Sequence, residues 1–249
     1  MSLHNILTQA ISKTKEDPVV QWNDETWTEL VVDNAFGEFS QYLKNEPMVN
    51  QGNKRCHGYY ALLHNIVSSL PENAGICELG NRRGLSTICI LDAMELSHRF
   101  ITMDNVEDLR MVPVAKANEL TQVGIFMPLI GDCLEYENVS AVERFLDRPI
   151  DLLFCDTIHT YEQVSREFTT YESLLADEAI ILVDDIRDWG DHLKPEPGEL
   201  THPDQRTKYR FFEEWKGDKY DITELCHYPS GFAAFLYERN NENNSTTTV

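Results

Sequence analysis

Short runs of apolar, mostly β-type residues recur along the middle of the chain, and stretches with helical spacing of apolar residues separate them. The apolar runs cover residues 76–79, 100–103, 125–130, 150–155 and 179–183. The intervening stretches, with a period near that of a helix, cover 86–94, 113–122, 139–146 and 161–175. This alternation predicts a doubly wound α/β fold built on a parallel sheet.

The two ends of the chain follow a different pattern. After a polar, proline-rich stretch (188–204) and a predicted helix (205–215), two β-type runs at 220–226 and 231–237 predict a terminal hairpin. Residues 1–55 are less regular, with a helical patch near 36–43, and form an N-terminal extension that caps the site or makes an oligomer contact. Residues 56–239 then form one domain, and the polar tail 240–249 is expected to be disordered.

Charge and cysteine usage narrow the class of partner. Acidic residues outnumber basic ones by 42 to 21 in 249 residues, so the average surface repels phosphate backbones and anionic lipids. We therefore expect neither a nucleic acid nor a membrane partner. The six cysteines form no C-x-x-C pair, and no leader or membrane-spanning run is evident. These features predict a protein of the reducing cytoplasm.

The run from Ile76 to Ser86, ICELGNRRGLS, has the most specific local pattern. A β-type segment leads to Gly80 and Gly84, and a helical segment follows, which predicts a strand, a tight loop and a helix N-terminus. In a parallel sheet this junction lies where nucleotide-like cofactors bind. The run lacks both the G-x-G-x-x-G and the G-K-[ST] patterns, and Glu78 would repel a pyrophosphate. A cofactor without phosphates is therefore favoured, and the alternative is a glycine turn that only closes the junction.

Two further acids follow predicted strands. Asp104 ends the second strand, about 20 residues after the glycine loop, where a carboxylate can accept hydrogen bonds from ribose hydroxyls. Asp132, with Cys133 beside it, ends the third strand and is placed to meet an adenine amino group. Taken singly, each is more often a turn or helix-capping residue.

Three aspartates form a second set at the ends of later strands. Asp156 ends the fourth strand, and Asp184 and Asp185 end the fifth, with no evident Lys or Arg partner nearby in sequence. Such carboxylates repel one another unless a cation or proton is present, and all-oxygen ligands suit Mg, Mn or Ca. The alternative is that one aspartate caps a helix and another pairs with Arg187.

His159 lies three residues after Asp156 on the same predicted loop. A neutral imidazole beside a metal-held hydroxyl can accept its proton near neutral pH. A solvent-facing or capping histidine is the alternative. The position predicts a general base.

Together these residues carry a resemblance. The pattern Glu78-Leu79-Gly80-x-x-x-Gly84-x-Ser86, then Asp104, Gly131-Asp132 and Asp156 with Asp184-Asp185 resembles the class I S-adenosylmethionine-dependent methyltransferases. The spacing is similar to the metal-dependent catechol-type O-methyltransferases. The stretch from Phe154 to Ile186 is closer to a bacterial branch that includes macrolide-sugar O-methyltransferases and the cephalosporin-biosynthesis family. The resemblance covers about residues 55–237.

The resemblance implies a Rossmann-like, seven-stranded, mostly parallel sheet with an antiparallel C-terminal hairpin strand. It implies S-adenosylmethionine as cofactor and Mg²⁺ or Mn²⁺ held by Asp156, Asp184 and Asp185. His159 would be the base, where catechol-type members carry lysine. The residues implied to bind the cofactor are Glu78, Gly80, Asn81, Gly84, Ser86, Asp104, Asp132, Cys133 and Asp156.

The predicted function is O-methylation of a hydroxyl on a small molecule, such as a sugar or natural product, by a protein that could form a homo-oligomer. Candidates for the acceptor pocket are Arg55, His57, Tyr59, Trp189 and His192. One alternative is a non-catalytic or regulatory binding module, against which the intact Asp156, His159, Asp184 and Asp185 set argues. Another is a metal-dependent enzyme of other chemistry, although no H-x-D facial triad with a distant histidine is evident.

Overall fold

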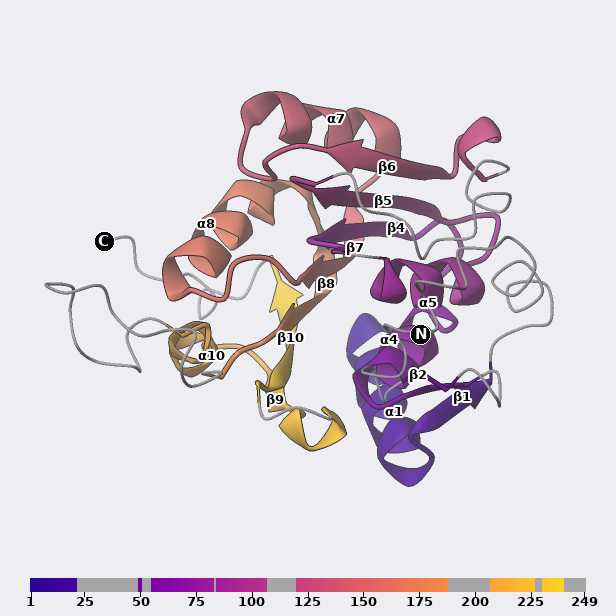
Figure 1. Ribbon diagram of the computed structural model, residues 1–249, viewed down its shortest axis with the longest axis vertical. Helices are drawn as coiled ribbons and strands as arrows, with labels where there is room; N and C mark the ends of the chain where they lie inside the picture. The colour runs from indigo at the N-terminus through magenta and orange to yellow at the C-terminus, as the bar shows by residue number, and fades with distance from the viewer. Residues whose placement is uncertain are drawn as a thin grey trace, which may run out of the picture.

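The computed structural model describes residues 1–21, 49–50, 55–82, 84–106, 120–187, 207–226 and 230–239. A seven-stranded sheet with the order β6-β5-β4-β7-β8-β10-β9 forms its centre (Figure 1). The strands are β4 (Gly75–Leu79), β5 (Arg99–Asp104), β6 (Phe126–Ile130), β7 (Ile150–Cys155), β8 (Leu175–Asp184), β9 (Lys219–Asp221) and β10 (Phe232–Glu238).

The strand order confirms the predicted topology. Strands β4 to β8 pair in parallel, whereas β10 is antiparallel to both β8 and β9. The chain runs outward from β4 through β5 to β6 and then returns to β7 on the other side. Ligands of open α/β sheets bind at the carboxyl ends of the strands beside such a reversal, so the β4–β7 junction is where a site is expected.

Helices cover both faces of the sheet (Figure 1). One face carries α1 (Leu3–Glu16), α4 (Tyr59–Val67) and α5 (Leu85–Ala93), and the other carries α7 (Tyr136–Leu146), α8 (Tyr161–Tyr171) and α10 (Tyr209–Glu214). Alternate side chains of each strand enter the two cores: in β7, Leu152 and Phe154 pack on the α4 side, and Leu153 and Cys155 on the α8 side. Strands buried on both faces account for the continuous apolar runs in the sequence.

The N-terminal region is more regular than its sequence suggested. Helix α1 buries Leu3, Ile6, Leu7, Ala10 and Ile11 against the main core, and Ser2 caps its start by accepting a hydrogen bond from the Asn5 amide at 3.3 Å. A small antiparallel sheet follows, with β3 (Arg55–His57) between β1 (Val19–Gln21) and β2 (Val49–Asn50). The helical patch predicted near 36–43 lies outside the described residues.

Several predicted bounds differ from the structure. The strand predicted at 220–226 ends at Asp221 and gives way to a 3₁₀ turn (Thr223–Leu225), because Asp221 Oδ1 accepts a hydrogen bond from the Thr223 amide at 3.1 Å. The helix predicted over 161–175 ends at Tyr171, and a 3₁₀ turn leads into β8 at Leu175. Most of the predicted helix 113–122, the tail 240–249 and the connection at Tyr228 and Pro229 lie outside the described residues.

No helix within the described part of the chain combines the length and the apolar character that crossing a membrane requires.

Candidate active site

The glycine loop after β4 packs directly on the end of β7. Gly80 has φ +81°, and a Cβ at this position would lie 2.1 Å from the carbonyl oxygen of Asp156. Any side chain here would both strain the backbone and collide with the neighbouring strand end. Gly84, with φ +90°, is the N-cap of α5. The loop thus places the α5 N-terminus beside the residues that follow β7.

Asp104 holds the glycine loop from the adjacent strand. Its Oδ2 accepts hydrogen bonds from the backbone amides of Asn81 at 3.0 Å and Arg82 at 2.8 Å, and its Oδ1 accepts one from Val106 at 3.1 Å. The structure therefore brings the predicted ribose-binding acid to the loop. It also gives Asp104 a second task, since each carboxylate oxygen can accept more than one hydrogen bond.

Glu78 lies beneath the loop and is fully buried. Its Oε2 accepts hydrogen bonds from the hydroxyls of Thr87 at 2.6 Å and Thr102 at 2.5 Å, and burial raises its pKa to about 7. The Ser86 hydroxyl also hydrogen-bonds this carboxylate, and the side-chain oxygen of Asn81 is buried with no hydrogen-bond partner in the described residues. An unpaired buried acceptor is energetically costly, so the space beside Glu78 and Asn81 suits a ligand that brings hydrogen-bond donors.

The remaining cofactor candidates lie at the same edge. Ser86 is nearly buried in the first turn of α5. Asp132 is exposed after β6, where its Oδ1 accepts a hydrogen bond from the Leu134 amide at 2.9 Å, so it also stabilises its own turn. Cys133 is buried beside it.

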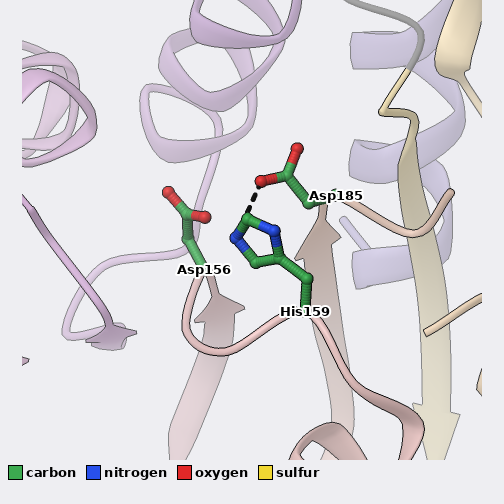
Figure 2. Close-up of side chains that lie close together, drawn as sticks. All are labelled: Asp156, His159 and Asp185. Carbon is green, nitrogen blue, oxygen red and sulfur yellow. Dashed lines mark ion pairs between the residues drawn. The ribbon is translucent and has the colours of Figure 1, made fainter. Parts of the chain in front are cut away.

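Asp156, His159 and Asp185 converge at the ends of β7 and β8 (Figure 2). One ligand atom from each lies within 4.8 Å of the other two, and His159 Nε2 is 2.9 Å from Asp185 Oδ2. Figure 2 shows the imidazole reaching from the loop after β7 toward the space between the carboxylates. Carboxylate oxygens and an imidazole nitrogen at these separations can surround one divalent cation.

The backbone at Asp185 is unusual for a residue with a side chain. Asp185 has φ +53°, in the left-handed region that non-glycine residues rarely adopt. Its amide donates a hydrogen bond at 2.8 Å to the side chain of Asp184, which also accepts one from Tyr59. The strained residue thus points its own carboxylate toward Asp156 and His159, while Asp184 is held by other partners. Strained backbone of this kind is common at functional sites.

The three aspartates repel one another. Burial, then the charges of Asp184 and Asp185, raise the pKa of Asp156 well above its usual value. Burial and the charge of Asp185 raise the pKa of Asp184 to about 8. Arg187 does not compensate this charge by direct pairing, because its guanidinium pairs with Asp221 and lies over the ring of Tyr209. A proton or cation is therefore needed here at neutral pH.

Lys208 is the cation that sequence reasoning missed. Its side chain is fully buried at the start of α10, and Nζ donates to the carbonyl oxygens of Asp184 at 3.0 Å and Cys155 at 3.5 Å. Those carbonyls belong to the peptide units that precede Asp185 and Asp156. Lys208 therefore connects the ends of β7 and β8 and partly offsets the charge of the aspartates. Because Lys208 lies far along the chain from these strand ends, no local sequence motif indicated the contact.

Replacing Lys208 by methionine should lower the free energy of unfolding by about 2 to 4 kcal/mol, because the two carbonyls lose their donor and the buried carboxylates lose a cation that offsets their charge. Urea denaturation without added divalent cation measures the change. Exposed Lys216 provides the matched control, and K216M should stay within about 0.5 kcal/mol of wild type. Equal stability of K208M and K216M would contradict this role.

The acceptor-pocket candidates are only partly described. Tyr59 is buried, stacks on Phe232 with ring centroids 4.8 Å apart, and contacts Asp184, so it supports the acid cluster from α4. Arg55 and His57 lie in β3, but their side chains are not among those described, and Trp189 and His192 lie outside the described residues.

Comparison with known proteins agrees with this fold. Residues 77–186 match the family model described as "Methyltransferase domain". The O-methyltransferase TomG from Streptomyces achromogenes, involved in tomaymycin synthesis and solved in complex with SAM, is 18% identical over 95% of this chain and 99% of its own, with a TM-score of 0.56. An O-methyltransferase from Bacillus cereus in complex with SAH is 16% identical over 86% of this chain and 96% of its own, also with a TM-score of 0.56.

No curated protein sequence matches the chain. The family match runs from within β4 to just past β8 and includes the glycine loop, Asp104, Asp132 and the Asp156, His159 and Asp185 cluster. Residues 77–186 thus match a methyltransferase domain, and the seven-stranded, mostly parallel sheet has the fold of these solved O-methyltransferases.

Proposed function

We propose that this protein is an S-adenosylmethionine-dependent O-methyltransferase that acts on a small-molecule hydroxyl with the help of a divalent cation. One observation carries the proposal: the Asp156, His159 and Asp185 cluster adjoins the glycine loop, with Gly80 packed against the backbone of Asp156. A methyl donor in the loop and a hydroxyl at the cluster would therefore lie next to each other, as transfer between them requires.

The glycine loop and its neighbours fit this cofactor chemically. The cofactor has an amino acid end, a sulfonium and an adenosine, but no phosphate. Among the described residues, the side-chain oxygen of Asn81 is a buried acceptor without a partner, and the acid Glu78 bonds the same Thr102 hydroxyl as Asn81, which suits the ammonium group. We assign Gly80, Gly84 and Ser86 to the loop around the amino acid end, Asp104 to the ribose, Asp132 and Cys133 to the adenine, and Asp156 to the boundary with the acceptor.

Asp156 and Asp185 would hold the cation, with Asp184 beside them, and the donor set fits Mg²⁺ or Mn²⁺. When bound, the cation orients the acceptor oxygens and lowers the pKa of the hydroxyl. An acceptor with two neighbouring oxygens suits such a site, and sugars and natural products with adjacent hydroxyls offer them.

His159 would remove the acceptor proton. Its contact with Asp185 orients the ring, and with Nε2–H donating to that carboxylate, Nδ1 is the nitrogen left to accept the proton. S-adenosylmethionine, when bound in the glycine loop, would supply the methyl group: a carbon–oxygen bond to the acceptor would form as the carbon–sulfur bond breaks, with S-adenosylhomocysteine as the leaving group. His159 would carry the proton released by the acceptor, which balances the loss of the sulfonium charge.

Incubation with S-adenosylmethionine carrying an isotope-labelled methyl group, Mg²⁺ and a panel of phenols, vicinal diols and sugars tests the proposal. NMR of the product should place the label on oxygen, with one S-adenosylhomocysteine formed per methyl transferred. Transfer to nitrogen or carbon would contradict the proposed reaction, and tight cofactor binding without turnover on any acceptor would favour a binding module.

Asp104 allows a sharper test of the cofactor site. Asp104→Ala should weaken S-adenosylhomocysteine binding by about 1 to 3 kcal/mol, because charge-assisted hydrogen bonds are lost and the loop amides of Asn81 and Arg82 lose their acceptor. Isothermal titration calorimetry measures the change. The exposed acid Asp147, at the far end of α7, is the control, and D147A should bind like wild type. Equal affinity of D104A and wild type would remove Asp104 from the site.

A further inference from the structure

Glu167 is a buried carboxylate on the inner face of α8. It is fully buried, as part of the helix face that also buries Val164, Phe168 and Tyr171. An acid at an apolar position is costly unless specific donors surround it. The hydrogen bonds that Glu167 makes therefore indicate its role.

The carboxylate joins two loops through one oxygen. Glu167 Oε1 accepts hydrogen bonds from the hydroxyl of Thr157, from Gln163 Nε2 at 2.8 Å and from the thiol of Cys133 at 3.7 Å. In the described part of the chain Glu167 makes no ion pair, and its Oε2 has no hydrogen-bond partner. The carboxyl group is thus held by three side chains, two of which come from loops that follow different strands.

Each of these loops carries residues of the proposed site. Thr157 lies between Asp156 and His159, so it belongs to the loop that presents the cation ligand and the base. Cys133 adjoins Asp132, the residue assigned to the adenine. Burial and the charge of Glu167 raise the pKa of Cys133 to about 12, which keeps the thiol protonated and able to donate. One turn further along α8, the Tyr171 hydroxyl donates to the Cys133 carbonyl at 3.0 Å.

We propose that Glu167 is a positioning residue that holds two loops against α8. These are the loop that carries Asp156, Thr157 and His159 (the cation-ligand loop) and the loop that carries Asp132 and Cys133 (the adenine loop). The inference rests on the proposed function, because that function gives the two loops their roles. Mutation of the residues that orient the ligands of a metal typically weakens metal binding by about 10- to 100-fold. Loss of these hydrogen bonds should therefore weaken binding of cation and cofactor together.

Four variants separate the two hydrogen bonds that Glu167 makes to these loops. Glu167→Leu removes the hydrogen-bond acceptor and replaces it by an apolar side chain of similar size. Glu167→Gln keeps a carbonyl oxygen that can accept a hydrogen bond. Thr157→Val removes the hydrogen bond between Glu167 and the cation-ligand loop, and Cys133→Ala removes the one between Glu167 and the adenine loop. Thr169→Val is the control, because this hydroxyl is on the same helix but is exposed and bonds only within α8, to the Ser165 carbonyl at 2.9 Å.

Calorimetric titrations with MnCl₂ and, separately, with S-adenosylhomocysteine measure the two affinities on the full chain. E167L should raise the dissociation constant of Mn²⁺ by about 10- to 100-fold and that of S-adenosylhomocysteine by about two- to tenfold. T157V should affect chiefly Mn²⁺, C133A chiefly S-adenosylhomocysteine, and E167Q should restore most of both affinities. The double variant E167L/T157V should bind Mn²⁺ no more weakly than E167L, because both changes remove the same hydrogen bond, between Thr157 and Glu167.

The outcomes distinguish this inference from the function on which it rests. If wild type binds neither probe, the proposed function fails, and the inference with it. If wild type binds both and E167L binds them equally well, or loses only thermal stability, Glu167 is structural and the proposal is overturned. Should E167L fail to fold, T157V and C133A decide: wild-type affinities in both variants overturn the proposal.

Discussion

Replacing His159 by alanine should lower the rate of methyl transfer by about 10²- to 10⁴-fold and leave the affinity for S-adenosylhomocysteine almost unchanged. The imidazole contacts Asp185 at the cation cluster, whereas the glycine loop and Asp104, which we assign to the cofactor, lie after β4 and at the end of β5. Its loss therefore removes the proton acceptor without disturbing cofactor recognition. A fall in kcat at constant cofactor affinity is the signature of a group that acts in the chemical step.

Steady-state kinetics and calorimetry on the same preparations measure this effect. The control is His4→Ala, since His4 is a partly exposed histidine on α1 whose ion pair with Asp218 lies away from the cluster. Mn²⁺ titration of H159A adds a second comparison: loss of Mn²⁺ binding would make His159 a ligand of the cation. Wild-type turnover by H159A would show that the acceptor proton leaves by another route.

Removal of the divalent cation should lower turnover by about 10³-fold, and Mg²⁺ or Mn²⁺ should restore it. The pKa values of Asp156 and Asp184 are raised by burial and by the neighbouring carboxylates, so without a cation these groups retain protons near neutral pH. A cation must displace those protons. Its affinity should therefore rise as the pH is raised toward 8.

Asp185→Asn should reproduce the loss that chelation causes, because the amide keeps the shape of the ligand but not its charge. Asp177→Asn is the control, since Asp177 is an exposed acid at the other end of β8 that pairs with Arg239. Turnover with EDTA and with added Mg²⁺ measures both effects. Full activity in EDTA, with metal analysis showing no bound cation, would leave the aspartates as structural residues.

The fold was largely predictable because strands buried on both faces leave continuous apolar runs. The predicted strand 150–155 coincides with β7, and the predicted antiparallel terminal pair is present as β9 and β10. Helix α1 was missed although it carries the relevant signals: Ser2 is a capping residue, and Leu3, Ile6, Leu7, Ala10 and Ile11 recur at helical spacing. The error at 220–226 came from a side chain, because Asp221 turns the backbone where the apolar pattern continues.

The site was predictable as far as it depends on strand ends. Topology alone brings the residues after β4, β5, β6, β7 and β8 to one edge, and the acids predicted there are all at that edge. Contacts between distant segments left no such pattern. Lys208 reaches the cluster from the start of α10, and Tyr59 reaches Asp184 from α4. Glu167 did leave a trace, as an acid on the apolar face of α8, but its partners follow only from the packing.

A crystal structure with S-adenosylhomocysteine and Mn²⁺ tests the central claim most directly, because anomalous scattering locates the cation independently of the model. We predict one manganese peak within coordination distance of the Asp156 and Asp185 carboxylates, with the ribose of S-adenosylhomocysteine at Asp104 and its sulfur facing the cluster. A peak elsewhere, or no density for S-adenosylhomocysteine at the glycine loop, would contradict the account.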